Sequence, residues 1–174
     1  MISVEHALSL VEPWLASYGA FALFVAIYLE SFGAPLPGES ALIAASVLAT
    51  RGDLSIIAVV VAGWAGAVLG DTTGYAVGRL GGRPLLMRFG PHIGLTTERF
   101  ERVADLVRRY GFITVMLARF VVLLRQLNGL VAGALSMPLT RFLPANIVGA
   151  GLWVAAWGLG PYLLGRWFEL STMR

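Results

Sequence analysis

A short polar break between two apolar runs constrains the fold of this chain more than any other feature. Residues 21–29 and 41–49 carry no charge, whereas Glu30 and Glu39 lie in the stretch between them. That stretch also holds four residues that disfavour a continuous helix, namely Gly33, Pro35, Pro37 and Gly38. Proline removes a backbone donor and clashes with the preceding helical turn, so we expect the helix to stop here.

The composition indicates that this break lies in a membrane. Of the 174 residues, 57% are hydrophobic and 13% are charged, which is roughly half the charged fraction of an ordinary soluble domain. A chain of this length is expected to form one integral membrane domain, residues 1–174. Inside a bilayer, broken backbone is tolerated only where protein buries it or where it lines a wet cavity. An ionisable residue at that depth indicates a functional site.

Several kinds of site are not expected. The chain has no cysteine, which excludes disulfides and thiolate metal sites. Its two histidines, His6 and His92, are far apart and lack ligand-like spacing, so neither a metal site nor a cofactor is expected. Residues 1–6 contain no lysine or arginine, so a cleaved signal peptide is not indicated.

The basic residues are distributed as in a membrane protein. All thirteen are arginine, and seven of them fall between Arg79 and Arg109. Because basic residues accumulate in cytoplasmic loops, this central segment is predicted to lie on the cytoplasmic side. Its expected partners are anionic lipids, and nucleic acid is not expected.

Two apolar runs are long enough to cross a bilayer as complete helices, residues 54–77 and residues 142–164. The first is rich in small residues, which let helices approach closely, and it contains Asp71 near its end. Asp71 is interpreted equally well as a helix-end residue or as a proton site. The second contains Asn146 and Trp153, residue types that in such a span more often pack or anchor than bind a ligand.

Two further apolar regions are interrupted, and each is predicted to form a re-entrant hairpin. The first comprises residues 14–29 and 41–49 around the proline break, and neither run is long enough to span alone. The second, residues 112–135, contains Arg119 and Arg125. Its turn-prone centre comprises Gln126, Leu127, Asn128 and Gly129, so a half-helix is expected to begin near Leu130.

Residues 96–110 predict an amphipathic helix that lies in the plane of the lipid headgroups. Thr96 or Thr97 can cap its start, and Gly111 is a natural stop after its end. Its apolar face is predicted to comprise Phe100, Val103, Ala104, Val107 and Tyr110.

The two halves of the chain share one order of segments. Each runs from an interrupted segment through a short return to a full span, and the pairs Tyr18-Gly19 and Tyr110-Gly111 open them. We therefore expect one repeat over about 14–82, a linker over 83–110 that holds the amphipathic helix, and a second repeat over about 111–167. Paired interrupted segments predict an all-α membrane protein with pseudo-symmetric, inverted repeats and a transport site at their interface.

The charges within the interrupted segments define the candidate site. Half-helices that begin inside the membrane point their positive dipole ends inward, and such ends bind anions. Arg119 and Arg125 add two guanidinium groups suited to bidentate contact with phosphate. Glu30 and Glu39, with Asp71 as a weaker candidate, are expected to carry protons or to gate the site.

Two other interpretations stay open. The glutamates and arginines can pair with one another and neutralise a buried core in a membrane-homeostasis or scaffold protein that transports nothing. The site can also serve a small soluble anion inside a closed cavity. Catalysis is not expected, because no nucleophile has a histidine or lysine partner and no Gly-rich phosphate loop is present.

Residues spread over roughly 18–166 form an ordered set that is more specific than any of its members. The set comprises Glu30, Pro35, Pro37, Gly38, Glu39, Gly70, Asp71, Gly74, Tyr75, Gly78, Arg79, Arg119, Phe120, Arg125, Ala132, Gly133, Met137, Phe142, Asn146, Gly149, Ala150 and Trp153. It resembles the DedA family of bacterial inner-membrane proteins, which is related to the eukaryotic VTT-domain proteins.

The resemblance implies a multi-pass protein of the bacterial inner membrane with re-entrant hairpins in inverted repeats and a role in lipid translocation. Similar members are linked to the return of undecaprenyl phosphate to the inner leaflet, and others to phospholipid scrambling and maintenance of the proton motive force. Glu30 and Glu39 match the family's essential acidic pair, and Arg119 and Arg125 match its essential arginine pair. The family usually carries a proline between these arginines, and its absence here shifts the expected break to residues 126–129.

We therefore expect a non-enzymatic translocase of undecaprenyl phosphate or a related anionic phospholipid. In this hypothesis the arginines hold the phosphate headgroup and the carboxylates gate the site or couple it to protons. Anionic membrane lipids are the expected partners, and a homo-oligomer is left open.

Overall fold

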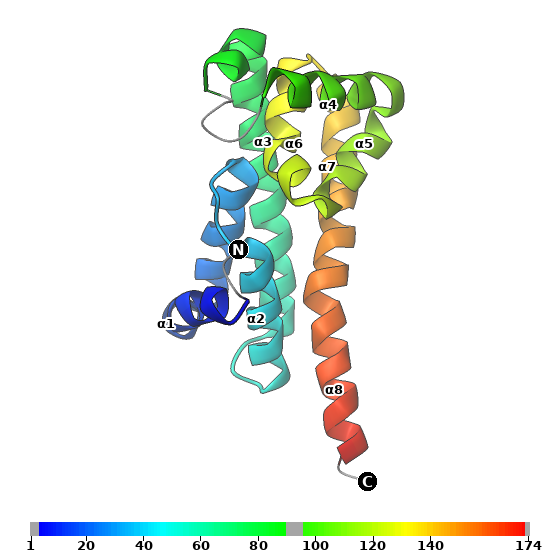
Figure 1. The fold of residues 1–174 in the computed structure, drawn as a ribbon. Coiled ribbons are helices and arrows are strands. Elements are labelled where there is room, and N and C mark those ends of the chain that lie inside the picture. The colour runs from blue at the N-terminus through cyan, green and yellow to red at the C-terminus, as the bar shows by residue number, and fades with distance from the viewer. Residues whose placement is uncertain (1–3, 90–95, 173–174) are drawn as a thin grey trace.

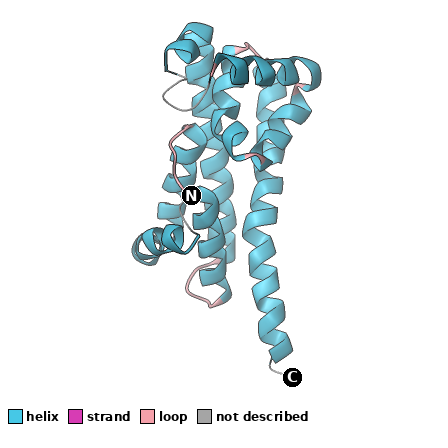
Figure 2. Cartoon of the chain, in the orientation of Figure 1, coloured by secondary structure: helices cyan, strands magenta, loops and turns pink. Residues whose placement is uncertain are grey.

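The computed structural model describes residues 4–89 and 96–172, and all the regular elements among them are helical (Figures 1 and 2). His92 lies outside the described residues. The elements in chain order are α1 (Val4–Phe32), α2 (Gly38–Thr50), α3 (Ile56–Phe89), α4 (Thr97–Tyr110), α5 (Phe112–Leu117), the 3-10 turn η2 (Ala118–Phe120), α6 (Val122–Ala134), α7 (Leu139–Val154), the π-helical turn η3 (Ala155–Leu159) and α8 (Gly160–Thr172).

The first hairpin is formed by α1 and α2, and the helix break predicted between them is present. α1 ends at Phe32 and α2 begins at Gly38, with Pro35 and Pro37 in the non-helical loop that joins them. At about 1.5 Å per residue, neither the apolar arm Tyr18–Phe32 nor α2 exceeds roughly 23 Å. Both arms are therefore shorter than the roughly 30 Å of a bilayer core.

Two helical rods are long and apolar enough to cross a bilayer, Ile56–Gly82 in α3 and Leu139–Phe168 in α7, η3 and α8. The first rod begins two residues after the start of the predicted span 54–77 and covers the rest of it, and the second contains the predicted span 142–164. At the end of the first span the helix bends at Gly82, which has φ 58° and ψ −163°. The helix does not end at this bend, and α3 continues beyond it to Phe89. Figure 1 shows the two rods lying alongside each other with opposite chain directions, and α3 packs against α7.

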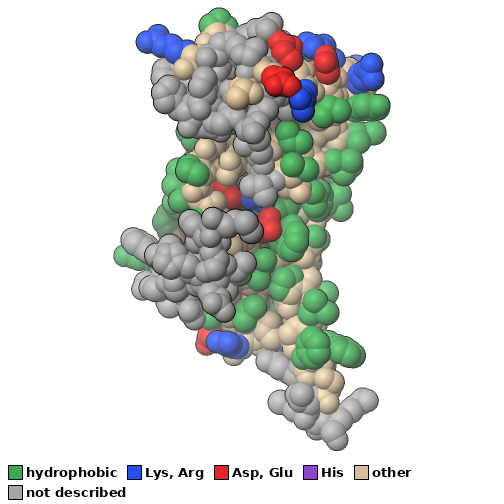
Figure 3. Space-filling view, in the orientation of Figure 1, with side chains coloured by type: hydrophobic (Ala, Val, Ile, Leu, Met, Phe, Trp, Pro, Cys, Tyr) green, Lys and Arg blue, Asp and Glu red, His purple; other side chains and the backbone are tan. Residues whose placement is uncertain are grey.

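The amphipathic helix predicted over residues 96–110 is α4, which Gly111, with φ 42°, separates from α5. On its predicted apolar face Ala104 is buried and Val107 is half-buried, while Tyr110 is exposed. The side chains of Phe100 and Val103 lie outside the described ones. Figure 1 shows α4 lying across one end of the molecule, and in Figure 3 charged side chains gather at that end.

The second hairpin is formed by α5, η2 and α6, and its break does not lie where the sequence predicts it. The helical path is interrupted at Val121, which is extended with φ −116° and ψ 114°. Helix α6 then runs without a break through Asn128 and Gly129, so the prediction of a helix break at these two residues is wrong. The half-helix begins at Val122 and not near Leu130.

Close packing explains why Gly129 lies inside a helix, where the sequence predicts a break. A Cβ atom on Gly129 would lie 2.1 Å from the carbonyl oxygen of Asp71 in α3, so a glycine lets the two backbones meet. On the side of α3 that meets α1, a Cβ on Gly70 would lie 2.4 Å from the carbonyl oxygen of Tyr28. Small residues thus bring both hairpins against α3, as the composition of that span predicts.

The two hairpins also begin with the same local feature, a glycine with positive φ. Gly19 and Gly111, each preceded by a tyrosine, take the left-handed conformation with φ 58° and φ 42°, and each bends the chain directly before its hairpin. The boundaries of the two repeats and their inverted symmetry remain predictions.

The outer surface is apolar along most of the molecule. Among the large hydrophobic side chains, Phe21 is 69% exposed and Ile57 is 73% exposed. Figure 3 shows hydrophobic side chains along both flanks between the charged end and the opposite end. An exposed apolar surface of this extent is typical of contact with lipid.

Candidate functional site

The predicted charges lie in two buried clusters between the helices. The first, the Arg125 cluster, comprises Arg125, Glu30 and Glu39. The second, the Arg119 cluster, comprises Arg119, Asp71, Asn128 and Asn146. Each cluster joins an arginine of the second hairpin to elements that are distant in the sequence.

Arg125, in the first turn of α6, bridges the two arms of the first hairpin. Its Nη2 donates to Oε1 of Glu30 at 2.7 Å, and its Nη1 donates to Oε2 of Glu39 at 3.0 Å. The side chains of Arg125 and Glu30 are each 3% exposed, whereas that of Glu39 is 34% exposed. Glu39 is therefore the member of the Arg125 cluster that a proton or a ligand from outside reaches first.

The loop of the first hairpin sets the positions of both glutamates. Gly33 has φ 119°, and its N–H donates to the carbonyl of Glu30 at 3.0 Å, which ends α1 just beyond that residue. Glu39 lies in the first turn of α2, where the helix dipole favours an anion. A Cβ on Gly38 would lie 2.2 Å from Oε2 of Glu30, so this glycine makes room for the Glu30 carboxylate at the start of α2.

Arg119 lies in the turn η2 and bonds to α3 and α7. Its Nη2 donates to Oδ2 of Asp71 at 2.8 Å and to the carbonyl oxygen of Ala67 at 3.1 Å. The same nitrogen donates to Oδ1 of Asn146, and Nδ2 of Asn128 donates to Oδ2 of Asp71 at 3.3 Å. The side chains of Arg119 and Asp71 are both completely buried. This arrangement keeps a single ion pair enclosed by neutral amides.

Trp153 of α7 completes the surroundings of Arg125. The guanidinium carbon lies 5.0 Å from the centroid of the indole ring, within the range of a cation–π interaction. Among the described residues, the buried donors without a hydrogen-bond partner are Nε of Arg125, Nε and Nη1 of Arg119, and Nε1 of Trp153. These are donors that an oxyanion can accept from.

The structure brings all five predicted charged residues into these clusters, in pairs that the sequence does not specify. Glu30 and Glu39 share Arg125, and Asp71 takes Arg119. The interpretation in which the glutamates and both arginines pair with one another therefore describes only the Arg125 cluster. The roles of these residues in binding or proton transfer remain predictions.

Three residues of the site are given other roles by the sequence analysis. Asn128 is predicted to break a helix, and Asn146 and Trp153 are predicted to pack or anchor, yet all three contact the charged residues. A signal was present for the two amides, because a polar side chain inside an apolar run needs a hydrogen-bond partner when it is buried. Nothing in the sequence indicates which partner it finds. Within the described residues, no group of three histidine, aspartate or glutamate side chains could hold a metal ion.

Comparison with known proteins connects this architecture to a family. Residues 36–169 match the VTT domain. An uncharacterized membrane protein of Synechocystis sp. is 41% identical over 92% of this chain and 73% of its own length. An uncharacterized membrane protein of Mycobacterium tuberculosis is 38% identical over 97% of this chain and 79% of its own length.

A more distant relative carries a functional name. Undecaprenyl phosphate transporter A of Bacillus subtilis is 23% identical over 95% of this chain and 82% of its own length. No solved structure gives a significant match. The match to the VTT domain covers well over half of the chain, and the relative from Synechocystis is similar along most of it. The chain therefore belongs to the VTT-domain, or DedA, family of membrane proteins.

Proposed function

We propose that this protein moves a lipid phosphate between the leaflets of the bacterial inner membrane, and that Arg125 holds the phosphate during transfer. The observation that carries the proposal is the position of Arg125, where one guanidinium at the meeting point of the two hairpins is shared by Glu30 and Glu39. The name of the distant relative from Bacillus subtilis supports undecaprenyl phosphate, or a related anionic phospholipid, as the cargo.

The proposed step is an exchange of anions at Arg125. With both glutamates ionised, the Arg125 cluster has one negative charge in excess, since one guanidinium faces two carboxylates. When Glu39 takes up a proton, its ion pair with Arg125 is lost and a phosphate oxygen takes its place. When the proton leaves, the carboxylate competes for the guanidinium again and releases the phosphate. The sum is transfer of one lipid phosphate with one reversible protonation.

The hairpins suit such a step because their arms are short. Neither Tyr18–Phe32 nor α2 is long enough to cross a bilayer, so we place both hairpins as re-entrant elements with Arg125 near mid-membrane. The headgroup is then sheltered between the hairpins while the apolar tail stays in the surrounding lipid. Donors without a partner on Arg125 and Trp153 supply further contacts for the phosphate oxygens.

Arg119 has a supporting role in this proposal. The sequence predicts it as a second headgroup contact, but its ion pair with Asp71 is enclosed on every described side by α3, α6 and α7. We assign the Arg119 cluster to holding η2, and with it the start of α6, against α3. It thereby positions Arg125 without touching the lipid.

The test is leaflet exchange of a fluorescent undecaprenyl phosphate in proteoliposomes, measured with a quencher confined to the outside. Wild type is compared with Arg125→Gln, which removes the cation, and with Arg102→Gln, which removes an exposed arginine on α4 whose side chain is 74% exposed. Gel filtration and thermal melting establish that each variant is folded.

Wild type and Arg102→Gln are expected to exchange the lipid at equal rates, and folded Arg125→Gln is expected to lose the activity. If no protein exchanges this lipid, the cargo is wrong, and repeating the assay with fluorescent phosphatidylglycerol tests the wider class of anionic phospholipids. If Arg125→Gln stays folded and exchanges lipid as wild type does, the exchange mechanism fails. If Arg125→Gln unfolds, Glu39→Gln serves as the second variant, because it changes a partly exposed member of the same cluster.

A further inference from the structure

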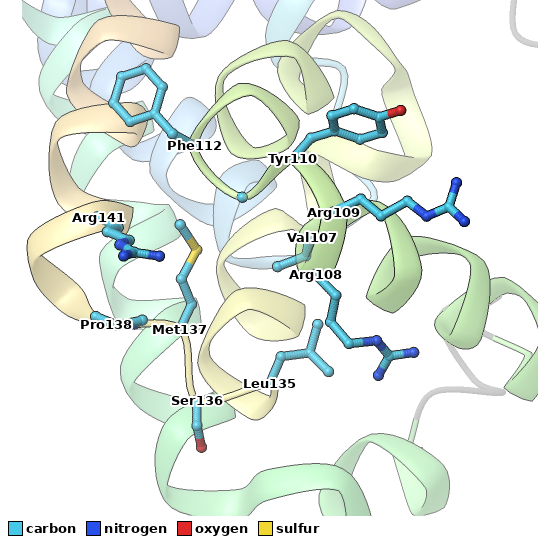
Figure 4. A pocket seen from close by; sticks show the side chains of 11 residues that line it. Val107, Arg108, Arg109, Tyr110, Phe112, Leu135, Ser136, Met137, Pro138 and Arg141 are labelled. Carbon is cyan, nitrogen blue, oxygen red and sulfur yellow. The ribbon is translucent and has the colours of Figure 1, made fainter.

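A groove separate from both charge clusters opens where α4 meets the turn between α6 and α7. It has a volume of about 560 Å³. Its walls come from the end of α4, the start of α5 and residues 135–138 before α7 (Figure 4). None of the residues of the Arg125 cluster or the Arg119 cluster lines it. The groove therefore lies between the linker helix α4 and the second hairpin, and it shares no lining residue with the proposed transfer site.

Three arginines line this groove from opposite sides. In Figure 4, Arg108 and Arg109 extend from α4 on one side, Arg141 lies on α7 on the other, and Met137 lies between them. Arg108 is paired with Asp105 at 2.6 Å. Within residues 4–89 and 96–172, Arg109 and Arg141 form neither an ion pair nor a side-chain hydrogen bond. The guanidinium groups of Arg109 and Arg141 are thus exposed with their donors free on the two sides of the groove.

The backbone around the groove also favours an anion. The N-terminal end of α7, which begins at Leu139, lies at the groove, and a helix N-terminus carries a partial positive charge. Ser136, in the preceding turn, lines the groove and has φ 58°, a conformation that L side chains rarely adopt. Backbone strain of this kind is often kept at ligand sites.

The remaining surface of the groove points to a lipid and not to a soluble anion. Val107, Leu135 and Met137 give the groove apolar wall between the arginines. The adjacent helix α5 starts at the groove with Phe112, which is 40% exposed, and continues to Leu117, which is 51% exposed. A molecule with its phosphate between the arginines can thus lay its acyl chains along α5.

We propose that this groove binds the headgroup of an anionic phospholipid, with its phosphate held by Arg109 and Arg141. The site is distinct from the Arg125 cluster and does not depend on transport. Occupied by a lipid from the surrounding membrane, it ties α4 to the α6–α7 turn. The partner is recognised by its phosphate and its acyl chains together, because the groove offers cations and apolar wall side by side.

The test is native mass spectrometry of the purified full chain in detergent, titrated with dioctanoyl-phosphatidylglycerol. The double variant Arg109→Gln/Arg141→Gln removes the two unpaired cations, and each single variant is measured as well. The matched control is Arg51→Gln/Arg102→Gln, which removes the same charge from two other exposed arginines. Arg125→Gln is included to separate the groove from the proposed transfer site, and thermal melting establishes that the variants are folded.

The double variant is expected to bind the lipid on the order of tenfold more weakly, because charge-assisted hydrogen bonds to phosphate are lost. The control pair and Arg125→Gln are expected to keep wild-type affinity, and dioctanoyl-phosphatidylcholine is expected to bind more weakly than the anionic lipid. Equal weakening by the control pair would show unspecific charge attraction and overturn the proposal. Displacement of the lipid by equimolar inorganic phosphate would overturn it too, since the ligand would then be a soluble anion. If the double variant unfolds, unchanged binding by both single variants overturns it.

Discussion

The Arg125 cluster and the Arg119 cluster both hold an arginine against a carboxylate inside an apolar protein, but they differ in charge and in exposure. Arg125 faces two carboxylates, and one of them, Glu39, is 34% exposed. Arg119 faces the single carboxylate of Asp71, and both side chains are completely buried. The Arg125 cluster has one more carboxylate than it has cations, and the carboxylate of Glu39 is partly exposed. Both features suit exchange of one anion for another. The Arg119 cluster is neutral and closed, which suits a fixed structural contact.

The difference follows from where each arginine lies in its hairpin. Arg119 is in the turn η2 and reaches the middle of α3, where small residues bring the helices close. Arg125 is one turn into α6 and meets the loop end of the first hairpin, where α1 ends and α2 begins. A closely packed helix interface excludes exchange, whereas a meeting of two hairpin ends leaves one side accessible. Four substitutions test this contrast, ordered by their expected effect on the free energy of unfolding.

Arg119→Met is expected to have the largest effect. It leaves Asp71 buried without its cation, which typically destabilises a protein by about 3–5 kcal/mol. Thermal melting in detergent measures the loss. The double variant Arg119→Met/Asp71→Leu, which removes both charges, is expected to recover much of the stability. Wild-type melting of the single variant would contradict a structural role for this cluster.

Gly129→Ala is expected to follow, at about 2–3 kcal/mol, because the added Cβ would lie 2.1 Å from the carbonyl oxygen of Asp71 and force α6 away from α3. Gly151→Ala in α7 is the matched control, since its nearest neighbour would be a Trp64 side-chain atom at 3.9 Å. Chemical unfolding of the two variants side by side gives the comparison. Equal stability of both would mean that the close contact between α6 and α3 is not required.

Trp153→Phe is expected to destabilise by about 1–2 kcal/mol. The smaller ring leaves space in the core and offers Arg125 a weaker cation–π partner. In the proposed mechanism the indole N–H also donates to the phosphate and phenylalanine has no such donor, so leaflet exchange is expected to fall while the protein stays folded. Exchange at the wild-type rate would show that the ring only fills space.

Glu39→Gln is expected to change stability least, by less than about 1 kcal/mol, because the side chain is partly exposed and glutamine can still accept a hydrogen bond from Arg125. Its effect on transport is expected to be large. In the proposed mechanism, uptake of a proton by Glu39 frees Arg125 for the phosphate; glutamine has no proton to exchange, so any pH dependence of exchange is expected to vanish. Leaflet exchange measured at several pH values checks this. A retained pH dependence would show that a residue other than Glu39 takes up the proton.

The first helix break was predictable and the second was not, for a physical reason. Pro35 and Pro37 act through local backbone sterics, so their effect is the same in any surroundings. Asn128 and Gly129 act through what they contact. Asn128 bonds to Asp71, and Gly129 lets α6 pack against α3, so both stabilise a helix where local preference favours a turn. The interruption is at Val121 instead, a residue that carries no turn signal.

The sequence by itself determined the class of the molecule, because burial of long apolar runs, helix termination at proline and glycine, and the cost of charge in lipid depend on residue types and spacing alone. It also singled out Glu30, Glu39, Arg119 and Arg125 for that reason. The tertiary structure decided the pairing, since Glu30 and Arg125 are 95 residues apart and Asp71 and Arg119 are 48 apart. Ion pairing depends on distances of a few ångströms between side chains, and those distances exist only after the hairpins have packed against α3.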